Sequence, residues 1–365
     1  MEEKIYQVAL ELMPGIGDIS ARQLISYTGS ASSVFTADRK ILREIPGINS
    51  RIFEMIADSK PFNEAKKIVE DCERLDIQIL HYTDNAFPHR LKETPDFPNV
   101  IYTRGNANLN EDRMIAVVGT RNATDYGKST TERVIEDLAP LQPVVVSGLA
   151  YGIDIHAHKA ALEHGLKTFA VLAGGLDKVY PSVHKKVVDQ ILEQGAIISE
   201  NPPGVQAEAH FFPARNRIIA GMSDATIVVE AAKKGGALIT ANIADSYNRV
   251  VFAIPGNLNN SFSEGCNQLI RSQKANLYRN KEDLDYHLGW TAENNPVKTR
   301  KLLGLLTPQE QKVYELLSTE KDGVAIDMIS VKTDIASNQL SAILLNLEFQ
   351  GFIKTLPGKK YKTNY

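Results

Sequence analysis

Cysteine is scarce in this chain, and its scarcity excludes two classes of protein. Cys72 and Cys266 are the only cysteines among 365 residues, and they lie far apart in the sequence. Two distant cysteines provide neither a disulfide framework nor the close spacing of a metal or redox site. We therefore expect both thiols to be structural and the protein to work in a reducing, cytoplasmic compartment.

Long apolar runs and an excess of basic residues are also missing. No apolar stretch approaches the ~20 residues of a membrane-spanning helix, and residues 1–17 begin with acidic residues, unlike a signal peptide. Lysine and arginine number 41 against 44 acidic residues, for a net charge of −3. We expect no membrane contact. A nucleic-acid partner would need a local basic groove, because the whole molecule has no positive field.

The N-terminal end contains a duplicated pattern. Residues 12–25 (LMPGIGDISARQLI) and 44–56 (EIPGINSRIFEMI) both read apolar-Pro-Gly-Ile-Gly/Asn, followed by a helical pattern. Gly17 and Asn49 are residue types that suit a tight turn with positive φ. The pattern looks like a tandem helix-hairpin-helix (SAM-like) domain over residues 1–60. Its turn amides either face a DNA phosphate or serve only in packing, and the sequence leaves both possibilities open.

Six short apolar runs recur in the central part of the chain, with helical patterns between them. They are Met114–Val118, Pro143–Ser147, Thr168–Leu172, Ala196–Ser199, Ala225–Val229 and Val250–Ile254. Buried strands that alternate with helices indicate a parallel sheet covered on both faces. The predicted fold class is α/β, with an open, doubly wound sheet in a domain spanning residues 61–285. Its core covers 113–285, and we expect the lead-in at 61–112, with one helix and two short strands, to pack on this core.

Glycines and cations gather where these strands end. The residues concerned are Gly119, Thr120, Arg121, Ser147, Gly148 and Gly152. This edge is where open α/β sheets bind ligands, and glycine lets backbone amides approach an anion. The segment KKGGALITA has a similar character, with Lys234, Gly235, Gly236 and Thr240 at a helix start. It predicts a phosphate-binding turn; the alternative is a tight turn with solvated lysines.

The stretch HFFPARNRIIAG lies between the fourth and fifth runs, at the same edge. It contains Phe211, Phe212, Arg215, Asn216 and Arg217. Aromatic rings beside cations suit single-stranded nucleic acid, because rings stack on bases and guanidinium groups contact phosphates. The alternative is that one arginine holds the strand edge through Glu200 or Glu230. We expect both roles, with Arg215 facing the ligand and Arg217 more structural.

Signatures of catalysis are absent from the sequence. The first strand–helix turn reads GTRNATDYG rather than G-x-G-x-x-G, and no Walker A motif occurs. His156 and His158 do not share a helix face, so we interpret them as surface or packing residues rather than a metal pair. Three acids lie near the ligand edge: Asp154, Glu200 and Glu230. They are either candidate acids, helix caps, or partners of the arginines at 121 and 215. We expect no catalytic residue, metal or cofactor.

The C-terminal end predicts a third domain. Residues 286–303 read as a polar linker, and Thr307, Pro308 and Glu310 form a capping-box pattern at a helix start. A helix, a turn, a second helix and a hairpin then indicate a winged helix over 304–365. The last segment is basic, but SNQLSAILLNLEF, in the recognition-helix position, lacks arginine and lysine. Duplex reading, protein contact and regulation therefore stay open.

Six motifs together resemble one known family. In order they are VVGTRNATDYG, VVSGLAYGIDIHAHKAAL, VLAGGLDKVYP, FPARNRIIAGMSDATIVVEA, GGALITANIA and VFAIPGN. They resemble the DNA-processing protein A (DprA/Smf) family. The resemblance implies an extended Rossmann fold that binds single-stranded DNA, forms a homodimer and loads RecA recombinase onto incoming DNA in natural transformation, without catalytic turnover.

The resemblance also implies residue roles. The family's Gly-Ser/Thr-Arg falls on residues 119–121, with Arg121 a DNA contact, and its Phe-Pro-x-Arg-Asn-Arg falls on 212–217. Its Tyr-Pro-x-x-Asn falls on 180–184, where His184 replaces the asparagine and Lys185 beside it is a candidate phosphate partner.

Dimerisation is the remaining role that the resemblance implies. In the family a late helix mediates pairing, which here points to Leu269 and Ile270 as exposed residues of a dimer interface.

Two other functions remain as alternatives. One is a nucleotide-cleaving enzyme of the lysine-decarboxylase-like Rossmann group, which pairs a Pro-Gly-Gly-x-Gly-Thr loop with a glutamate. Residues 233–241 lack that glutamate, which counts against this function. The other is a winged-helix transcription regulator that uses the α/β domain as a ligand sensor.

Overall fold

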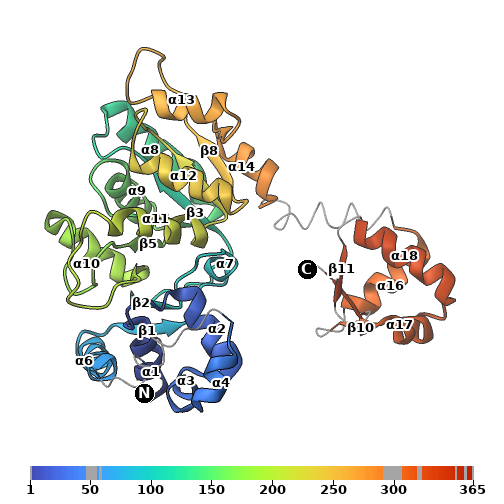
Figure 1. Ribbon diagram of the computed structural model, residues 1–365. Helices are drawn as coiled ribbons and strands as arrows, with labels where there is room; N and C mark the ends of the chain where they lie inside the picture. Colours follow the sequence, from blue (N-terminus) through green and yellow to red (C-terminus); the bar gives the residue numbers. More distant parts are fainter. Residues whose placement is uncertain are drawn as a thin grey trace. The chain divides into compact units, whose positions relative to one another are not determined.

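The computed structural model describes residues 2–46, 56, 60–290, 306–318, 323–349, 352–356 and 360–363. The chain divides into two compact units, Met1–Leu288 and Gly289–Tyr365. Each unit is described by itself below (Figure 1).

A nine-stranded sheet is the centre of the larger unit in the described residues. Its strands are β1 (Gln78–His81), β2 (Val100–Gly105), β3 (Met114–Val118), β4 (Val144–Ser147), β5 (Thr168–Val171), β6 (Ala196–Ser199), β7 (Ala225–Val228), β8 (Val250–Ala253) and β9 (Asn276–Leu277). Strands β3 to β9 pair in parallel, and the six predicted apolar runs coincide with β3 to β8. The prediction of an α/β fold with a doubly wound, mostly parallel sheet is confirmed.

The strand order is β1-β2-β6-β5-β4-β3-β7-β8-β9, so the direction of winding reverses at β3. The chain builds outward from β3 through β4, β5 and β6, and then crosses to add β7 and β8 on the other side. A reversal of this kind leaves a crevice at the carboxyl ends of the two central strands. In this protein the crevice lies over β3 and β7.

Helices cover both faces of the sheet because successive strand residues point to opposite sides. On one face Val144, Val146, Phe169 and Val171 join a core with α11 and α12, while on the other Ala170 joins a core with α10. The helices of this unit after β2 are α8 (Asp125–Leu138), η1 (Ala139–Leu141), α9 (Ile153–Glu163), η2 (Ser182–His184), α10 (Lys185–Gln194), α11 (Phe211–Met222), α12 (Gly236–Ser246), α13 (Glu264–Arg271) and α14 (Lys281–Leu288).

The lead-in segment extends the sheet, as the sequence predicts. It contributes α6 (Lys60–Arg74) and α7 (His89–Lys92), and β2 pairs antiparallel with β6. The N-terminal helices are α1 (Glu2–Glu11), α2 (Asp18–Thr28), α3 (Ala31–Thr36) and α4 (Arg39–Glu44), and they lie next to β1 and β2 (Figure 1).

In the first predicted hairpin the positive φ expected at Gly17 is wrong: Gly17 has a φ of −96°, and Gly15 takes the left-handed conformation instead. Gly15 has a φ of 84°, and Gly17 is the N-cap residue of α2. The turn of the second hairpin, including Asn49, lies outside the described residues. The helix-hairpin-helix assignment therefore stays a prediction.

The smaller unit contains three helices and a three-stranded antiparallel sheet in its described residues. They are α16 (Pro308–Ser318), β10 (Val324–Ala325), α17 (Ile326–Thr333), α18 (Ser337–Phe349), β11 (Ile353–Leu356) and β12 (Lys360–Thr363). The capping box is present: the Thr307 N–H donates to Glu310 Oε2 at 2.8 Å, and the Glu310 N–H donates to Thr307 Oγ1 at 3.4 Å.

Two expectations about single residues are settled by burial. Both cysteines are buried and unpaired, as predicted. The prediction that Leu269 is exposed is wrong, because it is 5% exposed and packs into the core beneath α13. Its side chain is therefore not available for the predicted dimer contact. Ile270 is only partly buried against the same core, and its dimer role stays a prediction.

Among the described helices, none has the length and apolar character to cross a membrane.

Candidate functional site

A cleft of about 480 Å³ lies at the crevice over β3 and β7. Four distant segments line it: residues 118–121 after β3, Ala150 and Asp154 before and within α9, residues 209–219 around α11, and residues 231–240 at the start of α12. The predicted site residues that meet here are Gly119, Thr120, Arg121, Phe212, Arg215, Asn216, Lys234, Gly235, Gly236 and Thr240. The topology therefore brings together most of the residues that the sequence singled out.

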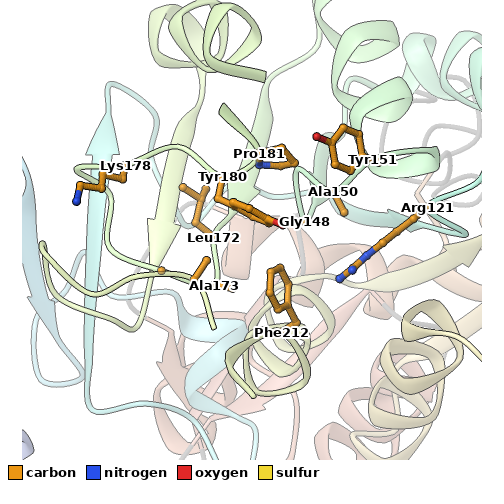
Figure 2. Close-up of a pocket in the computed structure, with 12 residues that line it drawn as sticks. Arg121, Gly148, Ala150, Tyr151, Leu172, Ala173, Lys178, Tyr180, Pro181 and Phe212 are labelled. Atoms are coloured by element: carbon orange, nitrogen blue, oxygen red, sulfur yellow. The ribbon is translucent and has the colours of Figure 1, made fainter. Parts of the chain in front are cut away.

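A second pocket adjoins the cleft and shares Arg121, Ala150 and Phe212 with it. Figure 2 shows this pocket, whose further lining includes Gly148, Tyr151, Lys178 and Tyr180. Sequence reasoning missed Tyr151 and Lys178. A signal was present, because Tyr151 stands between Gly148 and Gly152 and Lys178 follows a Gly-Gly pair, each shortly after a strand end.

Arg121 and Phe212 form the wall between the two pockets. The guanidinium carbon of Arg121 lies 5.0 Å from the centre of the Phe212 ring, toward which the side chain points in Figure 2. Tyr180 packs edge-on against the same ring at 6.0 Å. Arg121 is exposed, and in the described part of the chain it has no ion-pair partner. The wall therefore presents an available cation on an aromatic surface, held by a cation–π contact.

Arg215 lines the cleft but is largely buried, and its guanidinium is held by the protein rather than free to face a ligand as expected. It is 4% exposed, and its Nη1 donates to the carbonyl oxygens of Gly148 at 2.5 Å and Val171 at 2.6 Å. Burial lowers its pKa to about 10, and the nearby Asp154 carboxylate opposes that shift. Its Nε has no partner among the described residues. Arg215 thus fixes the loop after β4 to the end of β5, while it also forms part of the cleft wall.

Asp154 and Glu230 are acids of this edge with structural tasks. Asp154 accepts hydrogen bonds from the backbone N–H groups of Ala150 and Gly148; burial raises its pKa, and Arg215 opposes the shift. Glu230 is 1% exposed and binds Thr124 twice, from the backbone N–H at 3.0 Å and the hydroxyl at 2.7 Å. It therefore braces the N-terminus of α8, which agrees with the helix-cap interpretation, one of the three that the sequence left open.

Glu200 pairs with Arg217, which fits the expectation that an arginine of this stretch holds the strand edge; the alternative pairing with Arg121 or Arg215 is not seen. The reason is the direction of each side chain from α11: Arg215 points toward β4 and β5, whereas Arg217 reaches the end of β6. Burial raises the pKa of Glu200, and Arg217 opposes the shift. Arg217 lines neither pocket. The expected structural role of Arg217 is thus seen in the structure, and its predicted DNA contact lacks a supporting position.

The N-terminus of α12 opens onto the cleft. Its N-cap residue is Gly235, which has no side chain that could cap the helix amides. A Cβ on Gly235 or Gly236 would meet nothing within 4 Å. Lys234 is exposed beside them. Asn216 Nδ2 donates to the Gly236 carbonyl at 3.4 Å, and the Thr240 hydroxyl donates to the same oxygen at 3.3 Å. Free amides, a helix dipole and a lysine are the components of an anion site.

The remaining predicted residues lie elsewhere. Ser147 is fully buried and donates to the Val117 carbonyl at 2.6 Å, so its hydroxyl cannot reach a ligand. Gly152 has a φ of 75°, and its Cα is so close to the residue 120–121 backbone that no side chain would fit. Phe211 and Lys185 line neither pocket.

Three histidines near the site are explained by packing. His184 is buried, with its Nδ1 at 2.8 Å from the Leu149 carbonyl and its ring edge-on to Tyr151. His158 is buried against the Thr168 hydroxyl at 2.7 Å, and burial lowers its pKa to about 3. Burial also lowers the pKa of His156. The described residues contain no group of three or more His, Cys, Asp or Glu side chains that could hold a metal ion.

Comparison with known proteins gives the family. The family model described as DNA recombination-mediator protein A matches residues 78–288, and the DprA winged helix domain matches residues 299–359. Protein Smf of Synechocystis sp. is 32% identical over 99% of this chain and 98% of its own length. The chain belongs to the DprA/Smf family. The match to the DprA winged helix domain confirms the winged helix predicted at the C-terminal end.

Other DprA proteins cover shorter parts of the chain. The DNA processing protein DprA of Streptococcus pneumoniae is 44% identical over 52% of this chain and 66% of its own length. Its X-ray structure covers 78% of this chain and 96% of that chain, with a TM-score of 0.62. A DprA structure from Helicobacter pylori, titled for its single-stranded DNA binding mode, covers 58% of this chain and 95% of that chain, with 31% identity and a TM-score of 0.53.

Proposed function

We propose that this protein binds single-stranded DNA, protects it, and loads RecA recombinase onto it during natural transformation. It acts in the cytoplasm as a homodimer, and it does so without catalytic turnover. Membership of the DprA/Smf family supports this proposal, as does the single-stranded DNA binding named for the Helicobacter pylori relative. The domains of the proposal are residues 1–60, 61–285 and 304–365, with a linker at 286–303.

The observation that carries the proposal is the Arg121–Phe212 wall. An exposed guanidinium that stacks on an aromatic ring offers a charge to a phosphate and a π-face to a base at one place. Stacking on such a ring is worth ~1–3 kcal/mol per base and tolerates any sequence. The exposed rings of Tyr151 and Tyr180 extend the aromatic surface next to the wall. A single strand, whose bases are free, fits this surface better than a duplex.

The net charge of −3 does not prevent DNA binding, because cations gather locally around the two pockets. Arg121, Lys178 and Lys234 are exposed around the two pockets and lack ion-pair partners in the described part of the chain. The open N-terminus of α12 adds partial positive charge. This set supplies the local basic groove that a polyanion needs, with Lys234, Gly235 and Gly236 as its phosphate-binding turn.

Structural tasks of the edge acids speak against the nucleotide-cleaving enzyme. Asp154 and Glu230 stabilise loops and helix starts, and Glu200 is held by Arg217. An acid engaged in this way is a poor general acid or base, because it must be free to reach the substrate. Nothing in α18, which has no arginine or lysine, favours the transcription regulator.

Fluorescence anisotropy tests the proposal. Labelled poly-dT and a duplex of equal length are titrated with the protein across a series of salt concentrations. We expect tighter binding of the single strand, and an affinity that falls with salt as phosphate counterions are released. Equal affinity for both, or none for either, would refute the proposal, and release of a base from a nucleoside monophosphate would establish the enzyme instead.

A matched pair of variants locates the site. Arg121→Ala removes the cation of the wall, and Arg133→Ala removes an exposed arginine of α8 outside both pockets. We expect Arg121→Ala to weaken binding at least about tenfold, because a bond to a charged group contributes ~1.5–3 kcal/mol, and Arg133→Ala to leave it unchanged.

The remaining parts of the proposal have separate tests. Light scattering at tens of micromolar reports the dimer, and Ile270→Glu should yield monomers. RecA loading is measured as the rate of RecA filament growth on DNA coated by a single-strand-binding protein; acceleration by this protein is the expected result.

A further inference from the structure

The loop of residues 94–99 touches both helices that build the cleft. Its Asp96 carbonyl accepts a hydrogen bond from Arg217 of α11, and its Asp96 carboxylate accepts one from Tyr247, next to the end of α12. These helices begin at the cleft: α11 carries Phe212 and Arg215, and α12 opens with Gly236. The loop therefore contacts the far sides of the two elements that position the binding groups.

The other side of this 94–99 loop is held by the N-terminal helices. The Asn99 backbone N–H donates to Asp18 Oδ1 at 3.0 Å, and its side-chain amide donates to Glu11 Oε1 at 2.8 Å. Arg22 Nη1 donates to the Phe97 carbonyl and to Asn99 Oδ1, both at 2.9 Å, and stacks on the Phe97 ring at 4.0 Å. Asn99 is 1% exposed, so these bonds are shielded from water.

Arg217 joins the two sides directly. Besides Glu200 and the Asp96 carbonyl, its guanidinium lies 3.9 Å from Asp18 Oδ2, at the start of α2. Its side chain is 15% exposed. One guanidinium thus connects the strand edge at β6, the 94–99 loop and the N-terminal helices. Arginine suits this task because its planar fork makes several bonds in fixed directions, which lysine does not.

We propose that Arg217 is a positioning residue that, together with the 94–99 loop, couples the N-terminal helices to the cleft. Docking of α1 and α2 onto the loop fixes α11, and hence Phe212 and Arg215, in the geometry that the cleft needs. The N-terminal helices are then part of the binding architecture without touching the ligand. This inference rests on the proposed function only in its effect on DNA affinity; the coupling itself belongs to the free protein.

Amide hydrogen exchange in the free protein tests the coupling without DNA. Asp18→Asn keeps an acceptor for the Asn99 N–H but removes the charge facing Arg217, whereas Asp38→Asn makes the same change at a cap of α4. We expect faster exchange over residues 211–222 in Asp18→Asn and in Arg217→Lys, and wild-type exchange in Asp38→Asn. Unchanged exchange of α11 in both variants would overturn the inference, whatever the protein does with DNA.

DNA affinity and its salt dependence then separate positioning from contact. For Asp18→Asn and Arg217→Lys we expect about tenfold weaker binding of poly-dT, with the slope of log affinity against log salt unchanged. The double variant should lose less than the product of the two single losses, because both break one connection. A slope shallower by about 0.7 in a third variant, Arg217→Ala, would make Arg217 a phosphate contact and contradict the inference. Loss of thermal stability at unchanged affinity would contradict it too. If the wild type binds no single strand while exchange responds as expected, the proposed function fails and the coupling stands.

Discussion

Replacement of Gly148 by alanine tests whether Arg215 is as fixed as the structure indicates. A Cβ at this position would overlap the Arg215 guanidinium, whose Cζ would lie 2.5 Å away. The guanidinium would have to leave the carbonyls of Gly148 and Val171, and each bond to a charged group is worth ~1.5–3 kcal/mol. Water in the cleft would recover part of this loss. We expect Gly148→Ala to lower the free energy of unfolding by about 3 kcal/mol.

A second glycine of the same cleft provides the control. At Gly235 the backbone is extended, with φ at −178°, and a Cβ would meet nothing within 4 Å. The free energy of unfolding of Gly235→Ala should therefore lie within about 0.5 kcal/mol of that of the wild type. Urea denaturation of the full chain, followed by far-ultraviolet circular dichroism, gives both values. If the two alanine variants are equally stable, Arg215 is not held by these carbonyls, and it does not fix the loop after β4 to the end of β5.

Three further predictions concern single side chains. Phe212→Ala should weaken poly-dT binding by about tenfold or more through lost stacking, and anisotropy at several salt concentrations should give an unchanged slope, because no charge is removed. Burial raises the pKa of Glu11 from 4.5 to about 7, so the stability that its protonation contributes is full below pH 4.5 and is lost as the pH rises through about 7. At pH 8 the free energy of unfolding of Glu11→Gln, measured with urea, should exceed that of the wild type by up to about 3 kcal/mol. This gain should shrink at pH 5. Thr307→Ala removes the capping box of α16 and should destabilise the smaller unit by about 1 kcal/mol, seen as a lower melting temperature of that unit while Met1–Leu288 melts unchanged.

The sheet could be predicted because its signal is local. Each strand from β3 to β8 is a short apolar run bounded by turn residues, and each boundary fell within one residue of the run that predicted it. The ligand edge followed from the glycines at the strand ends. These features depend on neighbours in the sequence, and a single sequence records them directly.

The roles of the two arginines on α11 could not be assigned from the sequence with the same success. Arg215 and Arg217 stand two positions apart on a helix, so they point in different directions, and which one meets the cleft depends on how α11 packs. The structure sends Arg215 into the strand ends and Arg217 toward Glu200, so the structural role expected of Arg217 is seen, whereas the open position expected of Arg215 is not. The same limit explains Leu269, whose burial depends on the tertiary packing of α13.

The strand order determines when the cleft of this protein can be completed during its synthesis. The cleft needs residues 118–121, which are made early, and residues 231–240, which are made more than a hundred positions later. Because β7 completes the crevice only by pairing with β3, a growing chain that ends before β7 lacks both this pairing and the 231–240 side of the cleft. Contacts so distant in sequence form late in folding. We therefore expect the complete cleft, and with it the proposed binding, only when the large unit is nearly complete.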